Sequence, residues 1–269
     1  MTKQIHVMNL ERLTTAMGLQ HSGRAEEAAV EFGRMAAECD DPEWKSNLLL
    51  SEHVCYCILG RLVEAEQVLQ AMRQIKTDNA SIEVNKAFSE ACFFAQKGEL
   101  ELGLTTFDSI LNRFSVLLRS PEFRYLYEDI QQRRGAVLAK LGRYEEAISV
   151  LKEALSFELE LPARSDLLAN LGFCYSQLKR YGEAKDYFSR ALELGVTKNW
   201  ESQVHASLGI AYAHLGLLRE AKRELQICEQ RAEEYQLQMG PIYGWLRNVC
   251  ERLGERGESE KYERLVRPI

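Results

Sequence analysis

The sequence predicts an all-α solenoid, in which helical hairpins follow one another along the chain. The first reason is a short stretch, Gly-Arg-x-x-Glu-Ala, that fits a tight turn between two helices. It recurs, with looser copies, at residues 23–28, 60–65, 98–103, 142–147, 179–184 and 216–221. The second reason is spacing: with the turn glycine at position 15 of a unit, successive units begin 37, 38, 44, 37 and 37 residues apart, as in helical solenoids. The third is that the chain has only five prolines, four of which fall between units.

Other positions of the unit repeat as well, which supports the division into hairpins. Position 8 holds mostly small residues: Ala16, His53, Ala91, Gly135, Gly172 and Gly209. Position 20 is small in every unit: Ala28, Ala65, Gly103, Ala147, Ala184 and Ala221. Position 24 is large and apolar: Phe32, Leu69, Phe107, Leu151, Phe188 and Leu225. Small side chains would let paired helices approach, and the large ones would fill the space between them.

These positions resemble the tetratricopeptide repeat, and the unit from Ser165 to Lys198 is the closest match. Its Leu168, Leu171, Gly172, Tyr175, Ala184, Phe188 and Ala191 all fit the family pattern. The resemblance implies a right-handed superhelix that forms a single domain over residues 1–269. We expect repeats at 9–42, 46–79, 84–117, 128–161, 165–198 and 202–235. Residues 241–266 are predicted to form an incomplete, highly charged capping hairpin.

Composition and motif content argue against several classes of function. A formal charge of −6 argues against a nucleic-acid partner, and no apolar run is long enough for a membrane span or signal peptide, so we expect a cytoplasmic protein. Seven scattered cysteines indicate reduced thiols rather than disulfides. The five histidines lack metal-ligand spacing, and no catalytic motif is present. We therefore predict no metal, no cofactor and no enzymatic activity.

In the family, the first helix of each hairpin lines a concave groove that binds a protein or peptide partner. The positions that match this groove here are Leu13, Met17, Leu50, Val54, Phe88, Cys92, Arg133, Asn170, Phe173 and Ile210. Some family members hold a peptide's terminal carboxylate with a set of Lys, Asn and Arg residues. No window of three units supplies that set, so the resemblance does not imply such a clamp.

The first three units offer an apolar track, and such a track usually marks a binding site. We expect it to seat an apolar helix or peptide of a partner; the chain's own segment Ile5–Leu10 or a second copy of the chain are alternatives. The predicted function is a protein-interaction scaffold. A peptide-responsive regulator and a secretion or assembly chaperone remain alternatives. The long step between the third and fourth units marks a tolerated insertion or a hinge near residues 118–127.

Two further expectations concern packing. Apolar residues two positions before each unit start are expected to be buried: Val7, Trp44, Ile82, Leu126, Ala163 and Trp200. Glu90 and Arg134 stand at a half-buried position, where a charge needs a partner, and are expected to pair between adjacent units.

Overall fold

The computed structural model describes the backbone of residues 2–156, 161–196, 198–235 and 239–266. It describes the side chains of residues 10–156, 164–196, 200–231 and 239–266. Within these ranges the chain forms fifteen α-helices and one 3₁₀ helix, without a β-strand. It divides into two compact units, Met1–Arg133 (unit 1) and Arg134–Ile269 (unit 2).

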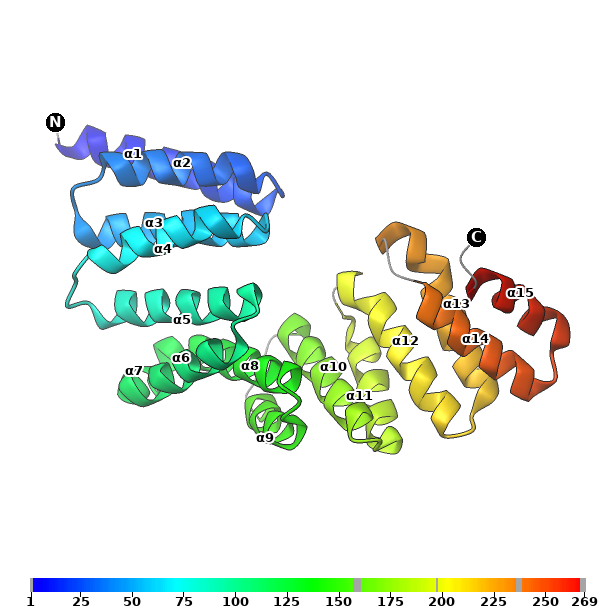
Figure 1. The fold of residues 1–269 in the computed structure, drawn as a ribbon. Coiled ribbons are helices and arrows are strands. Elements are labelled where there is room, and N and C mark those ends of the chain that lie inside the picture. Colours follow the sequence, from blue (N-terminus) through cyan, green and yellow to red (C-terminus); the bar gives the residue numbers. More distant parts are fainter. Residues whose placement is uncertain (1, 157–160, 197, 236–238, 267–269) are drawn as a thin grey trace. The chain divides into compact units, whose positions relative to one another are not determined.

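Consecutive helices pair as hairpins, and each hairpin packs on the next within its unit, which confirms the predicted all-α solenoid (Figure 1). The pairs in unit 1 are α1 (Thr2–His21) with α2 (Ala25–Glu38), α3 (Pro42–Ile58) with α4 (Leu62–Gln74), and α5 (Ala80–Lys97) with α6 (Leu100–Arg113). The pairs in unit 2 are α10 (Leu161–Gln177) with α11 (Tyr181–Leu194), α12 (Lys198–His214) with α13 (Leu218–Tyr235), and α14 (Gly240–Leu253) with α15 (Arg256–Val266).

The first helices are longer than a minimal repeat requires. In the second hairpin α3 begins at Pro42, four residues before Ser46, and Asp41 caps it by accepting a hydrogen bond from the Trp44 N–H. The helix α5 likewise begins at Ala80, four residues before Val84. The period of 37 or 38 residues therefore results from an additional helical turn at the start of each hairpin.

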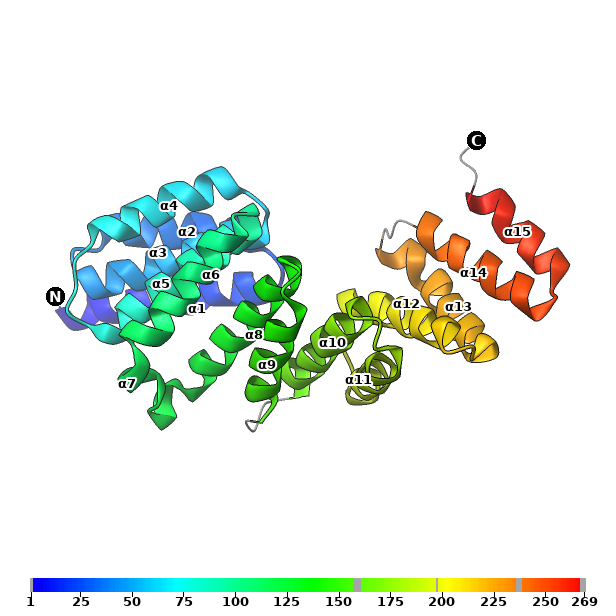
Figure 2. The same ribbon diagram turned by 60° about the horizontal axis from the view of Figure 1, so that its bottom comes forward.

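The 44-residue spacing between the starts of the third and fourth repeats results from an inserted segment with two short helices. These are α7 (Ser115–Leu118) and η1 (Pro121–Phe123), and Figure 2 shows them between α6 and α8 (Arg124–Lys140). Phe114 and Leu118 are both buried, so apolar contacts hold this inserted segment against unit 1. The last part of α8 belongs to unit 2, where it packs against α9 (Tyr144–Leu155).

The recurring turn motif has one local geometry. Gly142 has a φ of 76°, in the left-handed region, and its N–H donates to the Ala139 carbonyl while the Arg143 N–H donates to the Leu138 carbonyl. These bonds satisfy the last carbonyls of α8. Arg143 then holds Glu146 by two hydrogen bonds, Nε to Oε1 at 2.7 Å and Nη2 to Oε2 at 2.6 Å.

The same arginine–glutamate fork joins Arg24 to Glu27, Arg61 to Glu64 and Arg180 to Glu183. Each of these glutamates therefore has a cationic partner three residues earlier in the chain. These side chains are about half exposed, so the fork shapes the turn more than it stabilises the protein.

Contacts between positions 8 and 24 hold each hairpin together, as the sequence predicts. A Cβ added to Gly172 would lie 2.7 Å from Cδ1 of Phe188, and one added to Gly135 or Gly209 would lie 2.5 or 2.7 Å from the facing leucine side chain. Ala184 is fully buried at position 20 of the same hairpin. The two helices thus approach so closely that only hydrogen fits at position 8 in these hairpins.

In the second hairpin, position 8 is occupied by His53 rather than by a small residue, so the contact between the two helices differs. The ring is 1% exposed, Nδ1 donates to the Ala65 carbonyl at 2.9 Å, and its centroid lies 5.6 Å from that of Phe93. Burial lowers the pKa of His53, and hydrogen bonds to the backbone of Ala65 and Ser89 only partly oppose this. The imidazole is therefore held neutral inside unit 1.

The sequence predicts burial of the apolar residue that stands two positions before the start of each repeat. This prediction is confirmed at two of these positions and wrong at two. Ile82 and Leu126 are buried, whereas Trp44 and Trp200 are 40% and 41% exposed. Trp44 lies in the first turn of α3, at the end of the hairpin away from the tight turn. The side chains of Val7 and Ala163 lie outside the described residues.

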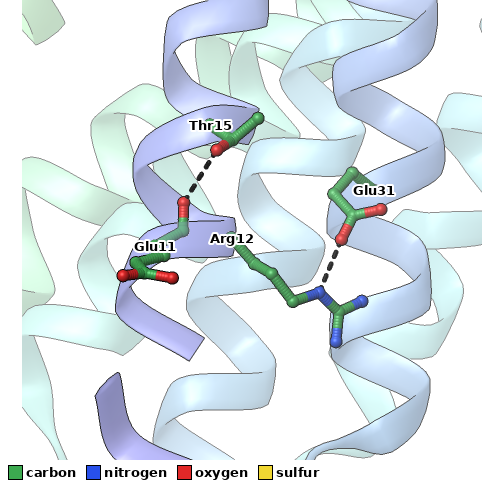
Figure 3. Close-up of a pocket in the computed structure, with 4 residues that line it drawn as sticks. All are labelled: Glu11, Arg12, Thr15 and Glu31. Carbon is green, nitrogen blue, oxygen red and sulfur yellow. Dashed lines mark hydrogen bonds and ion pairs between the residues drawn. The ribbon is translucent and has the colours of Figure 1, made fainter. Parts of the chain in front are cut away.

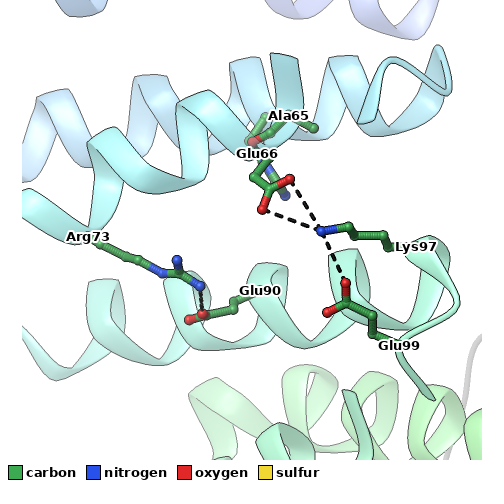
Figure 4. A network of polar contacts seen from close by, with 7 residues as sticks. Ala65, Glu66, Arg73, Glu90, Lys97 and Glu99 are labelled. Carbon is green, nitrogen blue, oxygen red and sulfur yellow. Dashed lines mark hydrogen bonds and ion pairs between the residues drawn. The ribbon is translucent and has the colours of Figure 1, made fainter. Parts of the chain in front are cut away.

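Glu90 pairs with Arg73, on the preceding helix α4 (Figure 4), and its expected pairing with Arg134 stays a prediction. Lys97 lies nearby, 3.3 Å from Glu66 on α4 and 3.0 Å from Glu99. The pairs Arg73–Glu90 and Lys97–Glu66 link the second and third hairpins across the α4–α5 contact. Because all of them are partly exposed, they contribute little stability.

We expect Gly172→Ala to lower the free energy of unfolding by about 1–3 kcal/mol, since the new methyl group would overlap Phe188. Gly182→Ala is the matched control. Gly182 lies in the first turn of α11 with open space around it, so alanine should raise the free energy of unfolding by up to about 1 kcal/mol. Urea unfolding of both variants measures the difference. Equal stability of the two variants would contradict the close contact.

We expect acidification to destabilise unit 1 through His53. Because its folded pKa is depressed, the unfolded state binds the proton more readily, and stability falls as the pH drops below the unfolded pKa of about 6.5. Urea unfolding at pH 7.5 and 5.5 should show a smaller pH effect in His53→Ala than in the wild type. His21→Ala, at an exposed histidine of α1, should keep the full pH effect.

Candidate functional site

Six of the predicted site residues form what we call the apolar face of unit 1: Leu13, Met17, Leu50, Val54, Phe88 and Cys92. They stand as pairs four residues apart on α1, α3 and α5, the first helices of three successive hairpins, so each pair shares one side of its helix. Leu13 and Leu50 are half-buried and also pack on the core of unit 1. Met17 is 45% exposed and is the most accessible member.

The structure brings three predicted site residues together, namely Phe88, Cys92 and Arg133. The Arg133 guanidinium lies 5.5 Å from the Phe88 ring centroid, and Nε donates to Asp129 at 3.0 Å. Burial lowers the pKa of Arg133, but Cys92 and Asp129 raise it more, so the pKa lies above its ordinary value. The arginine therefore remains charged while it covers one edge of the apolar face.

Neither Cys57 nor Cys92 is poised for nucleophilic or redox chemistry. Burial raises the pKa of the Cys92 thiol to about 12 and that of Cys57 to about 11, so both are protonated at neutral pH. Among the described residues, no group of three or more His, Cys, Asp or Glu side chains could hold a metal ion. Nor does that part of the chain contain a helix with the length and apolarity of a membrane span.

A polar hollow of about 290 Å³ lies between α1 and α2, away from the predicted residues (Figure 3). Arg12 lies at its centre and pairs with Glu31 and with Glu38, in both cases at 2.7 Å. The Thr15 hydroxyl donates to the Glu11 carbonyl at 2.9 Å. The charged groups that line the hollow are thus largely satisfied by one another, and nothing in it indicates a ligand.

In unit 2 the predicted residues Asn170, Phe173 and Ile210 lie on α10 and α12. Phe173 is 37% exposed and meets the Tyr144 ring edge-on, with 6.4 Å between centroids. Ile210 is half-buried and packs on the core formed by α12–α15. Asn170 is half-buried as well.

Unit 2 also contains an aromatic ladder that was not predicted from the sequence. The ring of His214 stacks on Tyr181 at 4.0 Å between centroids and meets Trp245 edge-on at 5.2 Å. The three residues come from α11, α12 and α14, that is, from three successive hairpins. Tyr181 and His214 are 33 residues apart in the sequence, and only stacking of the hairpins brings them together.

Two models of repeat families match parts of the chain, in agreement with its repeated helical hairpins. Residues 126–195 match the family model described as tetratricopeptide repeat, and residues 54–76 match the model described as PPR repeat. No curated protein sequence matches the chain significantly.

Solved structures with the same fold cover most of the chain. The apo form of RapI is similar over 97% of this chain and 76% of its own, with a TM-score of 0.72 and 13% identity. PilF of Pseudomonas aeruginosa is similar over 81% of this chain and 88% of its own, with a TM-score of 0.63 and 19% identity. A signal transduction ATPase of Pyrococcus horikoshii that has a tetratricopeptide repeat sensor gives a TM-score of 0.76 over 95% of this chain and 41% of its own, with 18% identity. The chain thus contains tetratricopeptide repeats at residues 126–195, within a longer array of helical hairpins whose fold is that of the solved neighbours.

Proposed function

We propose that the protein is a non-enzymatic scaffold for protein–protein interaction, and that the apolar face of unit 1 binds an apolar helix or peptide segment of a partner. The observation that carries this proposal is the exposed apolar stripe on α1. Leu10 is 60% and Met17 45% exposed, with the half-buried Leu13 between them, and spacings of three and four residues place all three on one side of the helix.

Charge indicates the kind of segment that would fit. Unit 1 has 14 basic and 20 acidic residues, a formal charge of −6, whereas unit 2 has 20 of each. None of the six residues of the apolar face is charged. A partner segment with apolar anchors and flanking lysines or arginines therefore matches both the face and the unit that surrounds it.

The chain's own N-terminal segment is a poor occupant. The backbone of Thr2–His21 is one continuous helix, so residues 5–10 are part of α1 itself and do not return over the face. A second copy of the chain is the remaining internal candidate, and the experiment below separates it from a different partner. In unit 2, we propose that Asn170, Phe173 and Ile210 provide a second contact region for a protein or peptide partner.

We expect the double variant Leu10→Glu/Met17→Glu to lose the proteins that the wild type captures from a lysate. The two introduced carboxylates would lose water without gaining a partner when an apolar segment binds. We expect this to weaken binding by about tenfold or more. Val30→Glu/Val63→Glu is the matched control, because it introduces the same two charges at exposed valines on the second helices α2 and α4.

A captured protein would then be purified and titrated calorimetrically against all three forms of the chain. Hydrogen exchange should show protection in α1, α3 and α5 when the partner is bound. Equal affinity of the two double variants would contradict the proposal. So would self-association that only the Leu10→Glu/Met17→Glu variant loses, because the face would then belong to a second copy.

A further inference from the structure

Positive charges surround the aromatic ladder of unit 2. Arg252, on α14, donates from Nη1 to the Ala213 carbonyl at 3.0 Å, which places its guanidinium beside His214. Lys179 stands two residues before Tyr181, in the turn between α10 and α11. Burial, Arg252 and Lys179, in that order, lower the pKa of His214. The charged side chains that act on this histidine are thus both cations.

These cations differ from others nearby because no carboxylate in the described part of the chain pairs with them. Arg180 is held by Glu183, and Lys222 is held by Glu255. By contrast, among the described residues the Lys179 ammonium has no hydrogen bond or ion pair, and only its backbone N–H is bonded, to the Ser176 carbonyl. The Arg252 guanidinium donates only to the backbone carbonyl of Ala213. Two positive charges therefore remain available beside three aromatic rings in a part of the molecule where acidic residues are plentiful.

The backbone at Lys179 is a second, independent observation. Lys179 has a φ of 60°, the only left-handed non-glycine residue among those described. The corresponding turn position in the other hairpins is glycine, at φ between 70° and 88°. A lysine is strained in this conformation and glycine is not, so the fold alone does not explain the residue. Strain that the surrounding structure tolerates without a local benefit points to a role for the side chain.

We propose that Lys179 and Arg252, together with Tyr181, His214 and Trp245, form a binding site for an acidic segment of a partner protein. The two cations would attract its carboxylates, and the exposed parts of the aromatic rings would pack on its apolar side chains. His214 stands between the other two rings, stacked on Tyr181 and edge-on to Trp245. This inference rests on the proposed protein-binding function but uses none of the residues of the apolar face of unit 1.

The experiment uses the full chain and a hexapeptide with four glutamates and a central Leu-Phe pair, acetylated and amidated so that no terminal carboxylate is present. The control peptide has four lysines instead. By calorimetry, the acidic peptide should bind more tightly than the lysine peptide, and its affinity should fall as salt is raised from about 0.05 to 0.5 M because charges are screened. In NMR spectra, the indole N–H resonance of Trp245 should shift when the acidic peptide binds, while that of Trp44 in unit 1 should not.

The variant Lys179→Gly distinguishes an effect on peptide binding from an effect on stability. It should raise the melting temperature, because the strain is relieved, and at the same time weaken binding of the acidic peptide by about threefold or more. Arg252→Glu should weaken it by about tenfold or more. Arg223→Glu, at an exposed arginine of α13, is the matched charge reversal and should leave the affinity unchanged.

Three outcomes would overturn the proposal. The first is equal binding of the acidic and lysine peptides. The second is an unchanged affinity in Lys179→Gly, which would leave that lysine without a binding role. The third is loss of a concentration-dependent dimer in Lys179→Gly and Arg252→Glu, which would assign the patch to a second copy of the chain. Variants of the apolar face of unit 1 should not affect this peptide, so the two proposals can fail separately.

Discussion

The close approach of the two helices within each hairpin is the constraint on which the rest of the structure depends. In unit 2 it takes its most extreme form, because Gly172 leaves no room for a methyl group against Phe188. Burying a side chain of that size contributes about 1.5–3 kcal/mol, and the benefit is lost if the helices separate. The same contact fixes how far each first helix stands from its neighbours. It therefore determines which side chains of those helices remain accessible to a partner.

The turn motif has a smaller energetic role than its regularity suggests. Its glycine ends the first helix in the left-handed conformation, and its arginine and glutamate form an exposed fork that water and salt screen. The motif is therefore the clearest marker of the architecture, while the buried contacts hold the hairpin. Lys179 illustrates the distinction, since the hairpin forms even where the favoured glycine is replaced.

The two units present different chemistry to a partner. The face of unit 1 is apolar and uncharged, within a unit that carries the whole formal charge of −6. Unit 2 is formally neutral, yet it gathers Lys179 and Arg252 near three aromatic rings, and among the described residues no carboxylate pairs with either cation. Partner segments of opposite character would therefore suit the two units, and one scaffold could hold two unlike sequences.

The sequence by itself determined the architecture, because helix termini and hairpin contacts depend on residues close together in the chain. The glycine turns, the small residue at position 8 and the large one at position 24 lie within about twenty residues of each other, and a single unit displays them. Leu13, Met17 and their counterparts could be placed on one helix side for the same reason. Only the tertiary structure decided which of them remain open: Leu50 is drawn partly into the core, and Met17 is not. Likewise, the stack of Tyr181, His214 and Trp245 arises where three hairpins meet, and the stacking of whole hairpins leaves no periodic signal that singles out these rings.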